Sequence, residues 1–156
     1  MMFKKIMVCL DGSKLAEQII PYAAEEAFCF NAKLVLFQSY IIPSAVAAAQ
    51  AQVVFASGPD IIQEEANRLH AEATKYLESM ATKLRERGLD VTCVVTRGSA
   101  GEAIIDYAHH EEIDLIAIAT HGHGGLGRVI FGSVADHVLR ESGLPILVIK
   151  PKHADS

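Results

Sequence analysis

The chain has 156 residues, the length of a single domain spanning residues 1–156, and its 51% of hydrophobic residues excludes a disordered chain. The net charge of −5 argues against sequence-independent binding to nucleic acid, which depends on Lys and Arg at the phosphates. No apolar run is long enough to cross a bilayer and no signal peptide is recognisable, so we expect a cytoplasmic protein that contacts no membrane.

Apolar runs of strand length alternate with amphipathic runs of helix length in the first part of the chain. They predict a strand at Lys5–Leu10, a helix capped by Ser13 that continues to about Phe30, and a strand at Lys33–Tyr40. One face of that helix is expected to turn inward, formed by Leu15, Ile19, Tyr22, Ala23 and Ala27. The stretch Ile41–Gly58 is rich in Ala, Gln and Val and predicts a long loop.

Six more elements follow this loop. They are a helix at Asp60–Arg87, a strand at Asp90–Thr96, a helix at Ala100–His110, a strand at Asp114–Thr120, a helix at Val134–Glu141 and a strand at Ile146–Lys150. Strict alternation of strands and helices is typical of an α/β fold with a parallel sheet and helices on both faces. Right-handed crossovers then predict a single doubly wound, five-stranded sheet in the order 3-2-1-4-5.

The three cysteines, Cys9, Cys29 and Cys93, lie far apart in the sequence, and each has apolar neighbours. This pattern predicts buried free thiols in a reducing compartment. Neither the cysteines nor the seven histidines have the spacing of a metal site.

Two strand ends carry the residues that suggest a binding site. The first predicted strand ends in Asp11-Gly12-Ser13, and the fourth is followed by a glycine-rich stretch from Thr120 to Gly127, with Gly132-Ser133 at the start of the next helix. In a doubly wound sheet, ligands bind beyond the carboxyl ends of the strands, where the strand order reverses. Glycine backbone and a helix N-terminus can bind phosphate through N–H groups, and a carboxylate can accept hydrogen bonds from a ribose or a base. The combination predicts a nucleotide site.

Other functional motifs fit the sequence less well. Gly122-x-Gly124-x-x-Gly127 matches the dinucleotide fingerprint, but the following strand, Ile146–Lys150, has no acidic residue for a ribose. A P-loop sequence is absent. We find no Ser-His-Asp or paired-carboxylate arrangement for catalysis, although His121-Gly122-His123 keeps slow ATP hydrolysis or nucleotidyl transfer open.

Three stretches of the sequence resemble the universal stress protein family, specifically its ATP-binding branch. They are KKIMVCLDGS at the start, DLIAIATHGHGG around the fourth strand, and FGSVADHVLRESGLPILVIKP near the end. The family's motif has two glycines separated by two residues, then nine residues, then Gly-Ser or Gly-Thr. Gly122 and Gly132-Ser133 follow that spacing, whereas Ala119 stands in place of the first glycine. The resemblance implies a Rossmann-like, adenine nucleotide alpha-hydrolase-like fold.

The resemblance also implies a ligand and the residues that hold it. The ligand is ATP, or AMP, with Mg²⁺ or Mn²⁺ accompanying the triphosphate. The adenosine side is expected to be formed by Leu10, Asp11 and Ser39. The phosphate side is expected to be formed by Gly122, Gly132, Ser133 and Val134, with His121 and Gly124 in the same loop. The methyl group of Ala119 lies where the backbone approaches the ligand, so an empty site stays an alternative.

The last predicted strand, Ile146–Lys150, lies at the edge of the sheet in this order and has apolar side chains on both faces. An apolar edge strand needs a partner, so we expect a homodimer that pairs this strand with its symmetry mate, as the resemblance also implies. The function expected is that of a nucleotide-binding stress or regulatory protein with no catalytic residue identified. A slow ATP-consuming enzyme and a dimeric interaction module without nucleotide are the alternatives, and the sequence identifies no regulatory protein partner.

Overall fold

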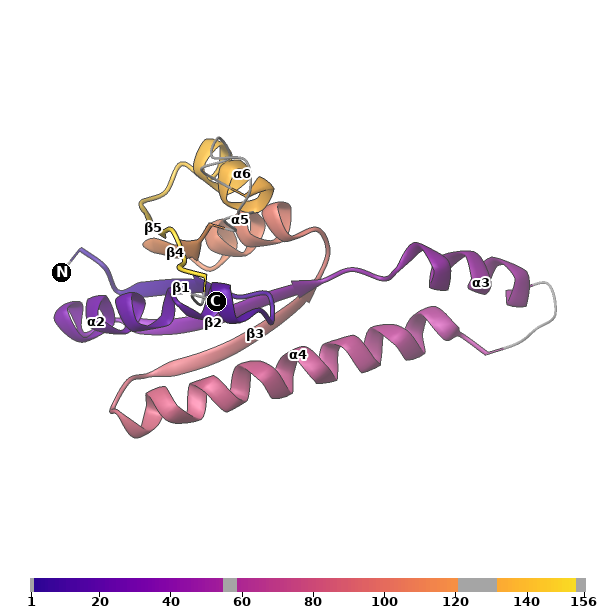
Figure 1. Ribbon diagram of the computed structural model, residues 1–156, viewed down its shortest axis with the longest axis horizontal. Helices are drawn as coiled ribbons and strands as arrows, with labels where there is room; N and C mark the ends of the chain where they lie inside the picture. Colours follow the sequence, from indigo (N-terminus) through magenta and orange to yellow (C-terminus); the bar gives the residue numbers. More distant parts are fainter. Residues whose placement is uncertain (1, 55–58, 121–131, 154–156) are drawn as a thin grey trace.

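A computed structural model describes residues 2–54, 59–120 and 132–153 of the chain. Within them, five parallel strands form one sheet in the order β3-β2-β1-β4-β5 (Figure 1). The strands are β1 (Lys5–Cys9), β2 (Lys33–Tyr40), β3 (Val91–Arg97), β4 (Leu115–Ala119) and β5 (Ile146–Ile149). The predicted α/β fold and its strand order are therefore confirmed.

Helices cover both faces of the sheet (Figure 1). One layer contains α1 (Lys14–Glu17), α2 (Ile20–Phe30) and α4 (Ile61–Glu86), and the other contains α5 (Ala100–His110) and α6 (Ser133–Glu141). Side chains of a strand alternate between the two layers, so Ile6 and Val8 of β1 join the first core cluster and Met7 joins the second. A sheet buried in this way on both faces requires nearly continuous apolar strands.

The helix predicted from Ser13 to Phe30 is two helices, α1 and α2. Ser13 caps α1 as predicted. Pro21 lies in the first turn of α2, where N–H groups have no partner within the helix, so proline is tolerated there and a new helix begins. Tyr22 is 56% exposed, so the prediction that it packs inward is wrong. The buried stripe of α2 is instead formed by Ala23, Ala24 and Ala27.

Only Cys9 of the three cysteines is fully buried, and all three are free thiols. Cys93 is partly buried, and Cys29 is exposed, which contradicts its predicted burial. Cys29 follows Ala27 by two residues on α2, so at 3.6 residues per turn it points away from the buried stripe.

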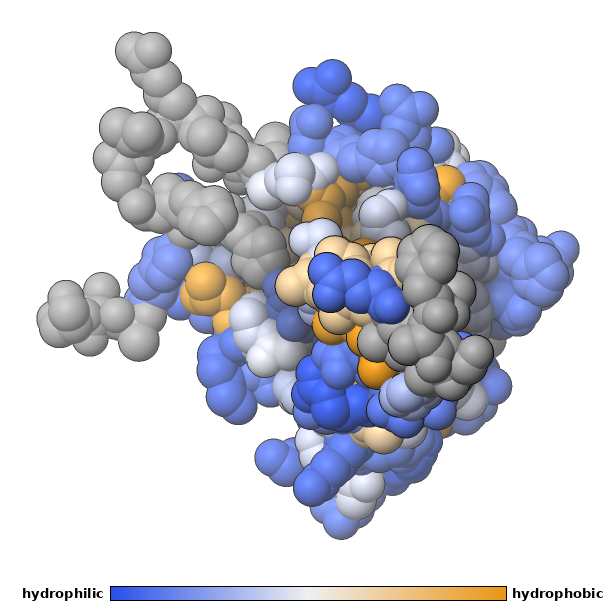
Figure 2. Space-filling model, turned by 90° about the vertical axis from the view of Figure 1, so that its right-hand side faces the viewer, coloured by the Kyte–Doolittle hydropathy of each residue, from blue (hydrophilic) through white to orange (hydrophobic). Residues whose placement is uncertain are grey.

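The stretch Ile41–Gly58, predicted as a loop, contains helix α3 (Ser44–Val54). Its apolar residues do not gather on one side, so helical periodicity is missing, but Ala, a strong helix former, fills five of its 11 positions. Helix α3 packs against α4 and projects with it beyond the sheet (Figure 1). Viewed from that end, the surface is mostly hydrophilic, with apolar side chains gathered near its centre (Figure 2). No helix in the described part of the chain is long and apolar enough to span a membrane.

Two side chains cap the N-terminus of α4, where it meets α3. Asp60 Oδ1 accepts a hydrogen bond from the backbone N–H of Gln63 at 3.0 Å. Gln50 Oε1, from α3, accepts one from the N–H of Ile62 at 3.1 Å. These bonds satisfy N–H groups that the helix itself leaves without partners, and the second also ties α3 to α4.

Replacing Asp60 with Ala is expected to lower the free energy of unfolding by about 1 kcal/mol, the usual cost of losing an N-cap side chain. Urea denaturation followed by circular dichroism measures this change. The matched control is Asp106→Ala at an exposed position inside α5, where Ala is the better helix former and no such loss is expected. Equal stability of wild type and Asp60→Ala would show that Gln50 alone is sufficient to cap this end.

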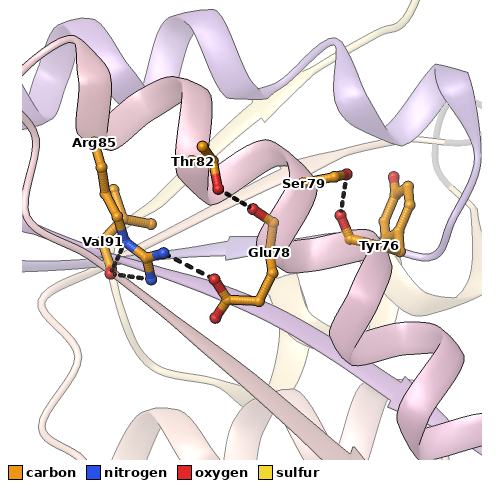
Figure 3. Close-up of polar contacts among 6 residues, drawn as sticks. All are labelled: Tyr76, Glu78, Ser79, Thr82, Arg85 and Val91. Atoms are coloured by element: carbon orange, nitrogen blue, oxygen red, sulfur yellow. Dashed lines mark hydrogen bonds and ion pairs between the residues drawn. The ribbon is translucent and has the colours of Figure 1, made fainter.

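Strand β3 forms one edge of the sheet, and Arg85 of α4 covers part of that edge (Figure 3). Its Nε and Nη2 atoms donate to the backbone oxygen of Val91 at 3.1 and 2.9 Å, and its Nη1 atom donates to Glu78 at 2.8 Å. The hydrogen bond with Glu78 raises the pKa of Arg85 and lowers the pKa of Glu78. The Val91 carbonyl oxygen already accepts two hydrogen bonds from Arg85, so pairing with another strand is blocked at this position of the edge.

Candidate functional site

A cavity opens at the carboxyl ends of β1 and β4, where the strand order reverses. It has about 470 Å³ of empty space, part of it open to solvent. Residues of both core clusters reach it, including Leu10 and Ala16 from one layer and Phe37 and Ile104 from the other. The cavity therefore straddles the end of the sheet and does not lie on a single face.

Six of the residues singled out from the sequence line this cavity: Leu10, Asp11, Ser39, Ala119, Gly132 and Val134. Ser133 lines an adjoining hollow, and Val134 borders both spaces. His121, Gly122 and Gly124 lie outside the described residues. The structure thus brings four separate chain segments together at one site, and their roles toward a ligand stay predictions.

The turn after β1 is stabilised by two of its own side chains. Asp11 Oδ1 accepts a hydrogen bond from the backbone N–H of Ser13 at 2.9 Å, and Ser13 Oγ accepts one from the N–H of Ala16 at 3.1 Å. Gly12 has a φ of 86°, a left-handed conformation that residues with a Cβ rarely adopt. The turn presents the exposed side of Asp11 at the rim of the cavity.

The N-terminus of α6 forms another part of the rim. Gly132 is its N-cap, and no side chain in the described part of the chain caps this end. The N–H groups of the first helical turn and the positive end of the helix dipole favour an anion at such a position. In the adjoining hollow, Ser133 lies with Ser99 from the start of α5 and with His137.

Sequence reasoning missed the apolar walls of the cavity, which are formed by Cys9, Ala16, Phe37, Ala100, Ile104, Ile118 and Ala135. A signal existed for Phe37, because it precedes Ser39 by two residues on β2 and therefore shares its face of the sheet. No local signal existed for Ile104, because its place depends on how α5 packs against α6 and β2. Burial raises the pKa of the Cys9 thiol, so Cys9 is a neutral, apolar part of the wall.

The sequence model of the Universal stress protein family matches residues 2–150 of the chain. Universal stress protein MJ0531 of Methanocaldococcus jannaschii is 28% identical over 150 residues, which cover 96% of this chain and 83% of that protein. The solved structure of MJ0577, from the same organism, has a TM-score of 0.81 at 25% identity and covers 99% of this chain and 100% of that chain.

Two further solved structures share the fold at lower identity. A universal stress protein in complex with cAMP has a TM-score of 0.62 at 20% identity, covering 96% of this chain and 98% of that chain. The universal stress protein from Archaeoglobus fulgidus in complex with dAMP has a TM-score of 0.59 at 21% identity, covering 96% and 100%. The family's sequence model spans nearly the whole chain, and solved members have the same fold. The chain therefore belongs to the universal stress protein family.

Proposed function

We propose that this protein binds an adenine nucleotide in the cavity at the carboxyl ends of β1 and β4, with ATP as the principal ligand and AMP as the alternative. The observation that carries the proposal is the convergence of Asp11, Ser39 and Gly132 on that cavity from three distant parts of the sequence. In a doubly wound sheet, this is the position at which ligands bind.

The chemistry of the lining suits the parts of a nucleotide. Apolar walls such as Phe37 and Ile118 suit the faces of a flat base, which have no polar groups to satisfy. The Asp11 carboxylate and the Ser39 hydroxyl can accept hydrogen bonds from a base amine or from ribose hydroxyls. The N-terminus of α6 can donate backbone N–H groups to phosphate oxygens.

The solved structures with cAMP and dAMP support the same ligand class, since both ligands combine an adenine nucleoside with phosphate. Their identity to this chain establishes the fold alone, so the proposal depends on the residues that line its own cavity. Ala119 is one of them, and it lines the cavity in place of the motif's first glycine.

The proposed role is that of a stress-response or regulatory protein whose state depends on nucleotide occupancy. Mg²⁺ or Mn²⁺ would accompany a bound triphosphate and be held mainly by its phosphate oxygens. Phosphate oxygens are the hard ligands that Mg²⁺ prefers, and Mg²⁺ usually binds through substrate phosphates and water with few protein ligands.

Calorimetric titration tests the ligand class and the cation together. We expect saturable binding of both ATP and AMP. Replacing Mg²⁺ with excess EDTA should weaken ATP binding about tenfold, or by about 1.4 kcal/mol, because the triphosphate charge is then unneutralised, and should leave AMP binding unchanged. Absence of binding by either nucleotide contradicts the proposed function, and equal sensitivity of both nucleotides to EDTA contradicts the placement of the cation on the triphosphate.

We further propose a homodimer in which β5 pairs with its symmetry mate. Strand β5 is the edge of the sheet opposite β3, and its four residues are apolar toward both helical layers. Arg85 blocks the Val91 carbonyl at the β3 edge, whereas no side chain of the described residues hydrogen-bonds to the backbone of Ile146–Ile149. An open apolar edge favours pairing with a second strand.

A further inference from the structure

The adjoining hollow is bordered by the first turns of α5 and α6, the two helices that pack against each other on one face of the sheet (Figure 1). It has about 610 Å³ of empty space, part of it open to solvent. Ala100 and Val134 border both this hollow and the cavity at the ends of β1 and β4, so the two spaces are neighbours. A ligand in the cavity can therefore extend into the hollow past these two residues.

The two spaces differ in chemistry. Apolar residues such as Phe37 form most of the cavity wall. In the hollow, four of the seven lining residues are polar: Ser99, Glu102, Ser133 and His137. Glu102 is exposed, so solvent screens its charge, whereas the first turns of both helices supply N–H groups that have no partner within the helix. The cavity thus suits a nucleoside, and the hollow suits phosphate groups beyond the first.

His137 adds a side-chain donor to this hollow. It follows Ser133 by four residues, so the two lie on the same face of α6, and helical side chains lean toward the N-terminus of their helix. The imidazole therefore leans toward the end of α6 at which the phosphates are proposed to bind. An imidazole has at least one ring N–H, and a hydrogen bond from it to a charged phosphate is among the stronger kinds in proteins.

The backbone of Gly101 supports the His137 ring. A Cβ on Gly101 would lie 2.6 Å from Cδ2 of His137, 3.1 Å from its Cγ and 3.4 Å from its Cβ. All three distances are shorter than the separation of about 3.5 Å at which carbon atoms make good contacts. The ring therefore packs directly on the first turn of α5, and any side chain at Gly101 would displace it. Glycine is unfavourable inside a helix relative to Ala, so this close approach gives the glycine a packing role.

We propose that His137 is a specificity-determining residue of the nucleotide site: its ring N–H donates to the terminal phosphates of ATP in the adjoining hollow, which AMP does not reach. The inference rests on the proposed function, because it requires the nucleoside in the cavity and the first phosphate at the N-terminus of α6. It adds a residue outside the cavity that separates a triphosphate from a monophosphate.

Replacing His137 with Ala removes the ring and its N–H. We expect about a tenfold loss of affinity for ATP, the scale of one hydrogen bond to a charged group, and no change for AMP. Calorimetric titration with Mg²⁺ present measures both affinities, and the thermal midpoint of the free variant checks its fold. His109→Ala is the matched control, since His109 is exposed on α5 and borders neither space, and it should bind both nucleotides as the wild type does.

A double variant tests whether Gly101 acts through the ring. Gly101→Ala should weaken ATP binding about as much as His137→Ala does, because the added methyl group displaces the imidazole. AMP binding should again be unchanged. With His137 already replaced by Ala, the ring is gone and Gly101→Ala should cause no further loss.

The outcomes separate the inference from the proposed function. Unchanged ATP affinity in His137→Ala, equal losses for ATP and AMP, or additive losses in the double variant each overturns the inference while nucleotide binding stands. A wild-type protein that binds AMP alone also overturns it. Failure of the wild-type protein to bind either nucleotide overturns both the inference and the proposed function.

Discussion

Replacing Gly132 with Val is expected to lower the affinity for ATP by at least about tenfold, or about 1.4 kcal/mol. Gly132 lines the cavity at the N-terminus of α6, where the proposed phosphate contacts are made through backbone N–H groups. A branched side chain at this position fills the space next to those groups. Gly132 has φ −65° and ψ 160°, an extended conformation that Val adopts without strain, so the protein should fold normally.

Calorimetric titration with ATP and Mg²⁺ measures this loss, and the thermal midpoint shows whether the variant is folded. The control is Ala51→Val, which places the same side chain at an exposed position of α3, the helix that packs against α4. It should bind ATP as the wild type does. If Gly132→Val binds ATP with unchanged affinity, the phosphates do not lie at the N-terminus of α6, and the proposed site is wrong.

The strands could be predicted from the sequence because each is an apolar run ended by polar or glycine residues. β4 is buried along its whole length, and its sequence LIAIA leaves no alternative face for solvent. Helix α3 could not be predicted in this way, because it packs against α4 beyond the sheet and needs no apolar stripe against the sheet. The break between α1 and α2 had a local signal in Pro21, which cannot lie inside a helix.

The candidate site was predictable where residues lie at the ends of elements. Asp11, Ser39 and Ala119 lie at carboxyl ends of strands, and Gly132 begins a helix, so the topology alone brings them to one edge of the sheet. Ile104 had no such signal, because its place at the cavity depends on how α5 packs against α6 and β2.

The hydrogen-bond register of β5 shows which of its residues face the open edge. The backbone oxygens of Pro145 and Ile149 accept from the N–H groups of Ile116 and Thr120 of the neighbouring segment, at 3.0 and 2.9 Å. In a parallel strand, alternate residues point their N–H and C=O groups to the same side. Pro145, Leu147 and Ile149 therefore face β4, and Ile146 and Val148 face the open edge. Val148 is one of the outward residues, and its N–H is not part of the ladder with β4.

Replacing Val148 with Pro is therefore expected to convert the proposed homodimer into a folded monomer. Proline removes an outward N–H donor that the symmetry mate needs, leaves the bonds to β4 intact, and is tolerated on an edge strand. Sedimentation velocity measures the outcome at concentrations where the wild-type protein is dimeric, and far-ultraviolet circular dichroism checks the fold. Val148→Thr is the matched control, because it keeps the N–H and the branched shape and should stay dimeric. A Val148→Pro variant that stays fully dimeric places the interface elsewhere, because no pairing through β5 survives the loss of that donor unchanged.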